Sequence, residues 1–189
     1  MTVPRPARGS GRRTLLLIAL VGFAPIVLST FFYVFSPRPA ATNYGQLLPT
    51  APAPEITGRT QDGAPFRLSA LRGRWLLVMA ADGACGAACP KSLYATRQAR
   101  TMQGAELDRV TRVWLVTDGA APAAETLRAQ PGLVVAHVDA GAVERLPGGA
   151  GALYIIDPLG NLVLQYPADP DIKGLAKDLR RLLRASSIG

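Results

Sequence analysis

The chain has two cysteines, Cys85 and Cys89, in the segment Ala-Cys-Gly-Ala-Ala-Cys-Pro. A cysteine thiolate is the nucleophile of disulfide exchange and also a soft ligand for Cu(I). This spacing brings two sulfurs together when the second cysteine begins a helix and the first lies on the turn before it. We therefore predict a reactive pair for thiol exchange or Cu(I) binding, in preference to a static disulfide or two inert buried thiols.

Two predicted elements position this pair. The apolar run Trp75–Ala80 is typical of a strand buried on both faces, and it ends at Asp82-Gly83. A helix is predicted over Pro90–Gln103, since proline suits a first helical turn. Unpaired amides at a helix start favour a thiolate, so we expect the cysteines to lie where their reactivity is raised.

The rest of the chain after residue 110 alternates strands and helices. Strands are predicted at Thr111–Thr117, Leu133–Val138, Leu153–Ile156 and Leu162–Tyr166, and helices at Ala121–Gln130, Ala140–Leu146 and from about Pro170. The last two strands form a hairpin around the turn Asp157-Pro-Leu-Gly160. This order predicts an α/β, thioredoxin-like three-layer sandwich, in which helices flank a central mixed sheet.

The N-terminal part reads as a membrane anchor. Residues 15–35 carry no charge and are long enough to cross a bilayer, which takes about 20 apolar residues. Four arginines precede this run (Arg5, Arg8, Arg12 and Arg13), which predicts a cytoplasmic N-terminus. A cleaved signal peptide is the alternative, but its apolar region is usually shorter. Both interpretations place the following domain on the periplasmic side of a bacterial inner membrane.

These patterns divide the chain into four parts: a basic tail (1–14), a transmembrane anchor (15–35), a proline-rich linker (36–54) and the thioredoxin-like domain (55–185). The net charge of +8 is concentrated at the N-terminus, because the 13 acidic residues all follow residue 50 together with only 16 of the 21 basic ones. This distribution is typical of a topology signal, so nucleic-acid binding is not expected. The basic face of the last helix (Lys173, Lys177, Arg180, Arg181, Arg184) is interpreted as solvated, with anionic lipid as the alternative.

Several motifs together resemble the Sco/SenC family of membrane-anchored, thioredoxin-fold copper chaperones. The run Cys-x-x-x-Cys-Pro follows a strand as it does in that family. The segments Pro65–Val78 and Leu153–Gly160 are similar to the family's preceding hairpin and strand and to its Tyr-Leu-Ile-Asp-Pro-Asp-Gly turn. The resemblance implies a role in cytochrome c oxidase assembly, with copper as cargo and an oxidase subunit or another thiol protein as partner.

One family feature is absent from this sequence. The family keeps a ligand histidine shortly before the Tyr-Leu-Ile-Asp strand, whereas here that region is Pro147–Ala152 and holds no histidine. The chain's only histidine is His137, one strand earlier. We interpret His137 as an ordinary strand-end residue, in preference to a displaced metal ligand.

Two functional hypotheses follow. The first is a membrane-anchored protein that exchanges thiols and disulfides, handles Cu(I), or both, during assembly of a respiratory oxidase; its enzyme class would be thiol-disulfide oxidoreductase. In it Cys85 attacks and Cys89 resolves the mixed disulfide. The second is a non-catalytic, membrane-tethered interaction module on a degenerate thioredoxin fold, which the missing histidine favours. Near the pair, Asp82 is interpreted as a turn residue in preference to a proton acceptor.

Overall fold

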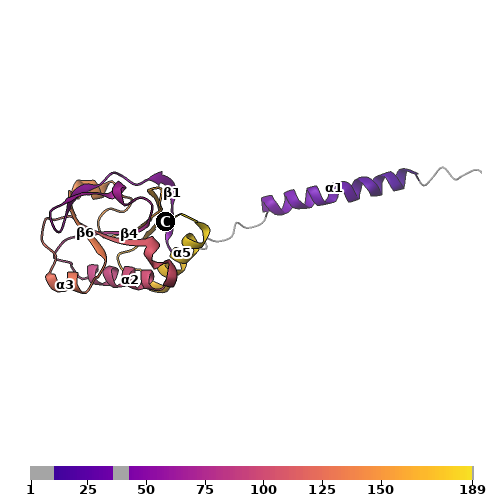
Figure 1. Ribbon diagram of the computed structural model, residues 1–189. Coiled ribbons are helices and arrows are strands. Elements are labelled where there is room, and N and C mark those ends of the chain that lie inside the picture. The colour runs from indigo at the N-terminus through magenta and orange to yellow at the C-terminus, as the bar shows by residue number, and fades with distance from the viewer. Residues whose placement is uncertain (1–10, 36–42, 189) are drawn as a thin grey trace, which may run out of the picture. The chain divides into compact units, whose positions relative to one another are not determined.

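The computed structural model describes residues 11–35 and 43–188, and the chain divides into two compact units after Thr42 (Figure 1). The first unit contributes helix α1 (Gly11–Phe35), which has no buried residue and contains Pro25. In the described part of the chain, α1 is the one helix long and apolar enough to cross a membrane. The linker expected over 36–54 and the basic tail expected over 1–14 lie partly outside the described residues, at 36–42 and 1–10.

The second unit, Asn43–Gly189, contains one mixed sheet in the order β1-β8-β7-β4-β5-β6-β2-β3. The strands are β1 (Gln46–Pro52), β2 (Thr57–Thr60), β3 (Pro65–Arg67), β4 (Trp75–Ala81), β5 (Val110–Val116), β6 (Leu133–Val138), β7 (Leu153–Ile156) and β8 (Asn161–Tyr166). Strands β4, β5 and β6 pair in parallel, and the remaining pairs are antiparallel. The fold is thioredoxin-like, as predicted, with helices flanking a mixed sheet.

The helices divide between the two faces of the sheet. The helical elements of this unit are η1 (Leu68–Leu71), α2 (Cys89–Thr101), η2 (Gly104–Arg109), α3 (Ala124–Arg128), α4 (Ala140–Glu144) and α5 (Ile172–Ala185). Side chains of α2 and α5 share a hydrophobic core with one face of the sheet, and side chains of η1 and α4 share a second core with the other face. Figure 1 shows α2 and α3 on the same side of the sheet. Both cores and all eight strands belong to residues 43–189, so this unit has what it needs to fold alone.

Alternation along β4 explains how one strand serves both cores. Trp75, Leu77 and Met79 enter the core under α2 and α5, whereas Leu76, Val78 and Ala80 enter the opposite core. Successive side chains of a strand point to opposite faces, so a continuous apolar run is what a strand covered on both sides requires. The prediction of a buried central strand before the cysteines is therefore confirmed.

Strand β1 was not predicted. It lies inside the proline-rich segment expected as linker, and it pairs antiparallel with β8 with a shift in register between Leu47 and Ala51. Prolines are tolerated in such a strand because it is at the sheet edge, where one row of amides needs no partner. The globular unit therefore begins earlier than the expected start at Glu55.

Most other elements lie within about two residues of their predicted bounds. The clearest difference is α3, which covers Ala124–Arg128 instead of the expected Ala121–Gln130. Pro122 and Pro131 flank this segment, and a proline disfavours helical backbone in the residue before it, which excludes Ala121 and Gln130 from the helix. The helix begins only after Ala123, whose backbone is extended.

The first residues of the unit are held on helix α5 by a buried carboxylate. Asp178 is 1% exposed, and its Oδ2 accepts hydrogen bonds from the Gly45 amide (2.9 Å) and the Tyr166 hydroxyl (3.2 Å). Burial, and then the nearby Asp178 charge, raise the pKa of Tyr166, so its hydroxyl remains a donor. The amide of Asp171 donates to the Tyr44 hydroxyl (2.8 Å), and a Cβ on Gly174 would lie 2.6 Å from the Tyr44 ring. Tyr44 and Gly45 are thus fixed against α5.

Replacing Asp178 with alanine should lower the free energy of unfolding of residues 43–189 by about 2–3 kcal/mol, because two buried donors lose their acceptor. Urea unfolding followed by tryptophan fluorescence measures the change. The control is Lys177→Ala at the neighbouring exposed position, for which we expect a change within about 0.5 kcal/mol. Equal losses in the two variants would show that the carboxylate does not hold this junction.

Candidate functional site

Cys85 and Cys89 form a disulfide, and their Cα atoms lie 5.1 Å apart. Cys89 is the first residue of α2 and is buried, whereas Cys85 lies in the preceding loop and is half-buried. The expectation that the pair meets at the start of a helix is confirmed. Because the two sulfurs differ in exposure, Cys85 is the one within easier reach of another molecule.

Two successive turns build the cysteine loop. The Cys85 amide donates to the carbonyl of Asp82 (3.0 Å), and the Cys89 amide donates to the carbonyl of Gly86 (2.9 Å). Among the described residues, Cys85 is the one non-glycine with a positive φ, at 51°. This left-handed conformation costs about 1–2 kcal/mol in a residue with a side chain, so the surrounding loop must impose it. The two turns and this conformation place Cys85 beside Cys89 in the disulfide-bonded structure.

A second loop, after strand β5, clamps the cysteine loop at Gly83. The Gly83 amide donates to Oδ1 of Asp118 (2.8 Å), and a Cβ on Gly83 would lie 2.0 Å from the carbonyl oxygen of Ala120. The hydrogen bond from Gly83, with a further one from the Ala120 amide, lowers the pKa of Asp118 and keeps it ionised. The glycine is thus required for close approach of two backbones, and the carboxylate fixes the loop by a charge-assisted bond.

Asp82 acts as a turn residue in this structure. Its carbonyl accepts the Cys85 amide, and its Oδ1 accepts a hydrogen bond from Thr117 Oγ1 (2.9 Å). The first contact closes the turn before Cys85, and the second ties this turn to Thr117, the residue that follows β5. This supports the structural interpretation of Asp82 over a proton-accepting role.

The wall beside Cys89 is small and largely apolar. A pocket there is lined by Cys89 and by Met79, Ala80, Ala81, Ala88, Ser92, Gly151, Ala152 and Ala168. Ser92 Oγ donates to the carbonyl of Ala168, and the Gly151 amide donates to the carbonyl of Ala80 (2.9 Å). A partner that binds in this pocket therefore meets main-chain groups and small side chains, and the lining contains no charged side chain.

The loop 147–152, where the family resemblance would place a histidine, presents backbone to the pocket. Gly148, Gly149 and Gly151 all have positive φ, and no peptide bond among the described residues is cis. The Tyr154 hydroxyl donates a hydrogen bond to the carbonyl of Pro147 (2.6 Å), which links this loop to strand β7. Burial raises the pKa of Tyr154 to about 12, so the donor persists across the physiological range.

His137 lies on β6, two strands from β4, the strand that leads into the cysteine loop. It pairs with Val116 of β5 and Arg59 of β2 in the sheet, so β5 separates it from β4, at a lateral spacing of about 10 Å. Its Nε2 is 3.0 Å from Oε1 of Gln61, a polar partner that an ordinary strand-end histidine would have. Within residues 11–35 and 43–188, no group of three or more His, Cys, Asp or Glu side chains could hold a metal ion.

Sequence reasoning missed the Gly83–Asp118 contact. The two residues lie 35 positions apart, and each belongs to an Asp-Gly turn signal. Gly83 belongs to Asp82-Gly83, and Asp118 belongs to Asp118-Gly119. The parallel pairing of the two buried strands β4 and β5 could have indicated this contact, because their carboxyl ends lie at the same edge of the sheet.

Comparisons with known proteins agree with this geometry. A family model described as a transmembrane-like, thioredoxin-like C-terminal domain matches residues 75–186, and one described as a transmembrane-like N-terminal domain matches residues 4–36. No curated protein matches the sequence.

Many solved structures of similar fold are Sco proteins, which confirms the resemblance at the level of the fold. Yeast Sco1 with copper bound has a TM-score of 0.63 and 16% identity, covering 74% of this chain and 96% of that one. Bradyrhizobium japonicum ScoI with copper bound has a TM-score of 0.56 and 18% identity, with coverages of 70% and 99%. BsSco, a Sco-family cytochrome c oxidase assembly protein in which a disulfide switch was identified, has a TM-score of 0.58 and 13% identity, with coverages of 75% and 98%.

Gly83→Ala should destabilise the oxidised domain by about 2–3 kcal/mol, because the added methyl group overlaps the carbonyl oxygen of Ala120. This oxygen cannot easily shift, since the Ala120 amide is hydrogen-bonded to Asp118. Gly86→Ala is the matched control, since a Cβ there meets no atom within 4 Å. Urea unfolding without reductant compares the two. A loss for Gly86→Ala as large as that for Gly83→Ala would contradict the clamp.

Proposed function

This chain belongs to the transmembrane-like, thioredoxin-like family, and from that premise we propose that it is a membrane-anchored thiol protein that exchanges disulfides and carries Cu(I) during assembly of cytochrome c oxidase. One observation carries the proposal: two sulfurs are joined at the start of a helix, and one of them is half-buried while the other is buried. The copper-bound Sco structures and the disulfide switch of BsSco support the same chemistry.

In the exchange reaction, the Cys85 thiolate attacks one sulfur of a partner disulfide. The partner's S–S bond breaks, its second sulfur leaves as a thiolate and takes up a proton, and a mixed disulfide with Cys85 forms. The Cys89 thiolate then attacks the Cys85 sulfur, which releases the partner's first sulfur and forms the Cys85–Cys89 bond. The partner gains two electrons and this protein loses two. The reverse sequence oxidises a partner dithiol, and in either direction the protein is a thiol-disulfide oxidoreductase.

Copper is treated as cargo. When the pair is reduced, Cys85 and Cys89 supply two soft thiolates, a donor set that suits Cu(I) and its low coordination numbers. The loop 147–152 adds no side-chain ligand, and His137 is bonded to Gln61. A third ligand would come from solvent or from the protein that receives the ion, which favours transfer over retention.

The proposed location follows from the N-terminal unit. Helix α1 would cross the bacterial inner membrane, and the arginines before it would keep the N-terminus in the cytoplasm. The domain 43–189 would then lie on the periplasmic side, where disulfides persist. An oxidase subunit or another thiol protein is the proposed partner.

A second function, a non-catalytic interaction module, is favoured by one feature. The loop that faces Cys89 offers only main chain and small side chains, with no residue that would bind metal or move a proton. In this alternative the pocket binds a partner and the disulfide only fixes its shape. The two functions differ in whether the thiols react.

The roles of the two sulfurs predict different trapping behaviour. Reduced Cys89→Ser should accumulate a mixed disulfide with oxidised glutathione, because its Cys85 remains accessible and lacks a resolving thiol. Cys85→Ser should react about tenfold or more slowly, since Cys89 is buried. Mass spectrometry of acid-quenched samples measures both rates. Faster trapping at Cys89 would reverse the roles, and slow reaction of both variants would favour the interaction module.

Metal titration tests the copper part. Under anaerobic conditions the reduced domain should bind one Cu(I), competing with a chromogenic chelator, and should bind Cu(II) only weakly, because Cu(II) prefers nitrogen and oxygen donors. The double variant Cys85→Ser/Cys89→Ser should lose Cu(I) binding, since no other thiol exists in the chain. His137→Ala is the control and should leave the affinity within about twofold. Tight Cu(II) binding that requires His137 would show that it is a ligand.

A further inference from the structure

One carboxylate oxygen joins the cysteine loop to the loop that follows β5. Oδ1 of Asp118 accepts hydrogen bonds from the amide of Gly83 (2.8 Å) and from the amide of Ala120 in its own loop (3.1 Å). Gly83 is buried, whereas Asp118 is exposed. A buried amide without an acceptor is costly, so the position of Gly83 depends on this carboxylate. Asp118 therefore fixes the chain two residues before Cys85.

The two cysteines differ in how firmly the chain around them is held. Cys89 is the first residue of α2 and belongs to the core that this helix shares with the sheet. Cys85 lies in the loop, and its φ of 51° is in the left-handed region. The cost of this conformation corresponds to a factor of about 5–30 in an equilibrium constant. Of the two, Cys85 is therefore the residue whose backbone has a reason to change when the disulfide is broken.

Three hydrogen bonds oppose such a change once the pair is reduced. The Cys85 amide donates to the carbonyl of Asp82 (3.0 Å), a bond within the loop. The other two link the loop to the segment after β5: Thr117 Oγ1 donates to Oδ1 of Asp82 (2.9 Å), and the Gly83 amide donates to Asp118. Of these two links, only the one at Gly83 has a donor on the backbone of a buried residue. It is the link that restrains the path of the chain most directly.

We propose that Asp118 is a positioning residue for disulfide exchange, which holds Cys85 in its disulfide-bearing conformation and thereby favours the oxidised form of the pair. The inference rests on the proposed thiol function. In the oxidised form the bond to Cys89 keeps Cys85 in place. In the reduced form Cys85 is free to relax only if Gly83 gives up its acceptor, which opposes the relaxation. Without Asp118 the dithiol gains a conformation that the disulfide cannot adopt.

A purely structural role would leave the redox equilibrium unchanged. If the reduced loop kept the same conformation, Asp118 would stabilise both forms equally. Folding and reduction are linked equilibria, so a change in the redox equilibrium equals the difference between the stability losses of the two forms. The two roles of Asp118 are therefore distinguished by comparing the oxidised and the reduced protein.

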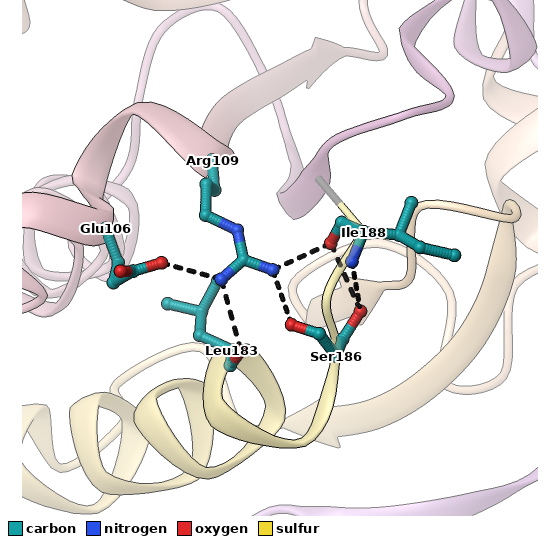
Figure 2. A network of polar contacts seen from close by, with 5 residues as sticks. All are labelled: Glu106, Arg109, Leu183, Ser186 and Ile188. Carbon is teal, nitrogen blue, oxygen red and sulfur yellow. Dashed lines mark hydrogen bonds and ion pairs between the residues drawn. The ribbon is translucent and has the colours of Figure 1, made fainter.

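A second polar network supplies a control at the other end of β5. Figure 2 shows that the Arg109 guanidinium donates to three carbonyls near the end of the chain, those of Leu183 (3.2 Å), Ser186 (2.7 Å) and Ile188 (2.8 Å). Arg109 directly precedes β5, whereas Asp118 lies two residues beyond its carboxyl end. Because β5 runs parallel to β4, Arg109 is at the opposite end of these strands from the cysteine loop. Its loss should lower stability without acting on the pair.

Equilibration of residues 43–189 with mixtures of reduced and oxidised glutathione tests the proposal. In this reaction two glutathione thiols give two electrons and two protons to the pair, the Cys85–Cys89 bond breaks, and one oxidised glutathione forms. Asp118→Ala should shift the equilibrium about tenfold toward the dithiol, which is about 30 mV. Asp118→Asn keeps an acceptor oxygen and should shift it by less than about threefold. Arg109→Ala should stay within about twofold of the wild type. Mass spectrometry after acid quenching measures the two forms.

Urea unfolding of the oxidised protein and of protein reduced with a phosphine gives an independent measurement. Asp118→Ala should destabilise the oxidised form more than the reduced form, whereas Arg109→Ala should destabilise both equally. The proposal would be overturned by equal losses in the two forms of Asp118→Ala, or by a glutathione equilibrium that is unchanged or shifted toward the disulfide. Wild-type protein that does not react with glutathione would refute the thiol function instead, and the unfolding comparison would still decide the role of Asp118.

Discussion

The rest of the site follows from one constraint: strand β4 is paired on both edges and buried on both faces. Strand β4 lies between β5 and β7, and its alternate side chains enter two separate cores. Such a strand cannot shift by one residue without exchanging every side chain between the cores. Its carboxyl end is therefore fixed, and so is the loop that carries Cys85. The position of Cys85 and Cys89 thus depends on β4, although β4 itself contributes no reactive group.

The loop after β4 is in turn held by hydrogen bonds to backbone and carboxylate groups. Gly83 allows the close approach to Ala120, Asp118 secures it, and Asp82 bonds to Thr117. This arrangement leaves the surface around the sulfurs small and apolar. A site of this kind excludes few partners by shape, so selectivity for a partner has to come from elsewhere on the molecule.

Local pattern was sufficient to predict β4, β7, the start of α2 and the periodic helix α5, because each has a strong signal within one segment. It also located the cysteine pair, since a strand, a turn and a helix start follow one another directly. Strand β1 was missed because Pro49 and Pro52 indicate a linker, and only the pairing with β8 makes them compatible with an edge strand. The Gly83–Asp118 clamp and the buried Asp178 were missed because their partners come from distant parts of the chain. The position of His137 relative to the cysteines likewise depended on strand order.

The prolines of β1 affect how this domain behaves when many copies lie close together. An eight-stranded sheet has two edges, and an exposed edge is a template for pairing with the edge of another copy. Here one edge is β1, interrupted by Pro49 and shifted in register, and the other is β3, three residues long and beginning with Pro65. Neither offers a long, regular row of free amides. Many copies confined to one plane would meet edge to edge far more often than in free solution, and these short or broken edges would keep such encounters from growing into aggregates.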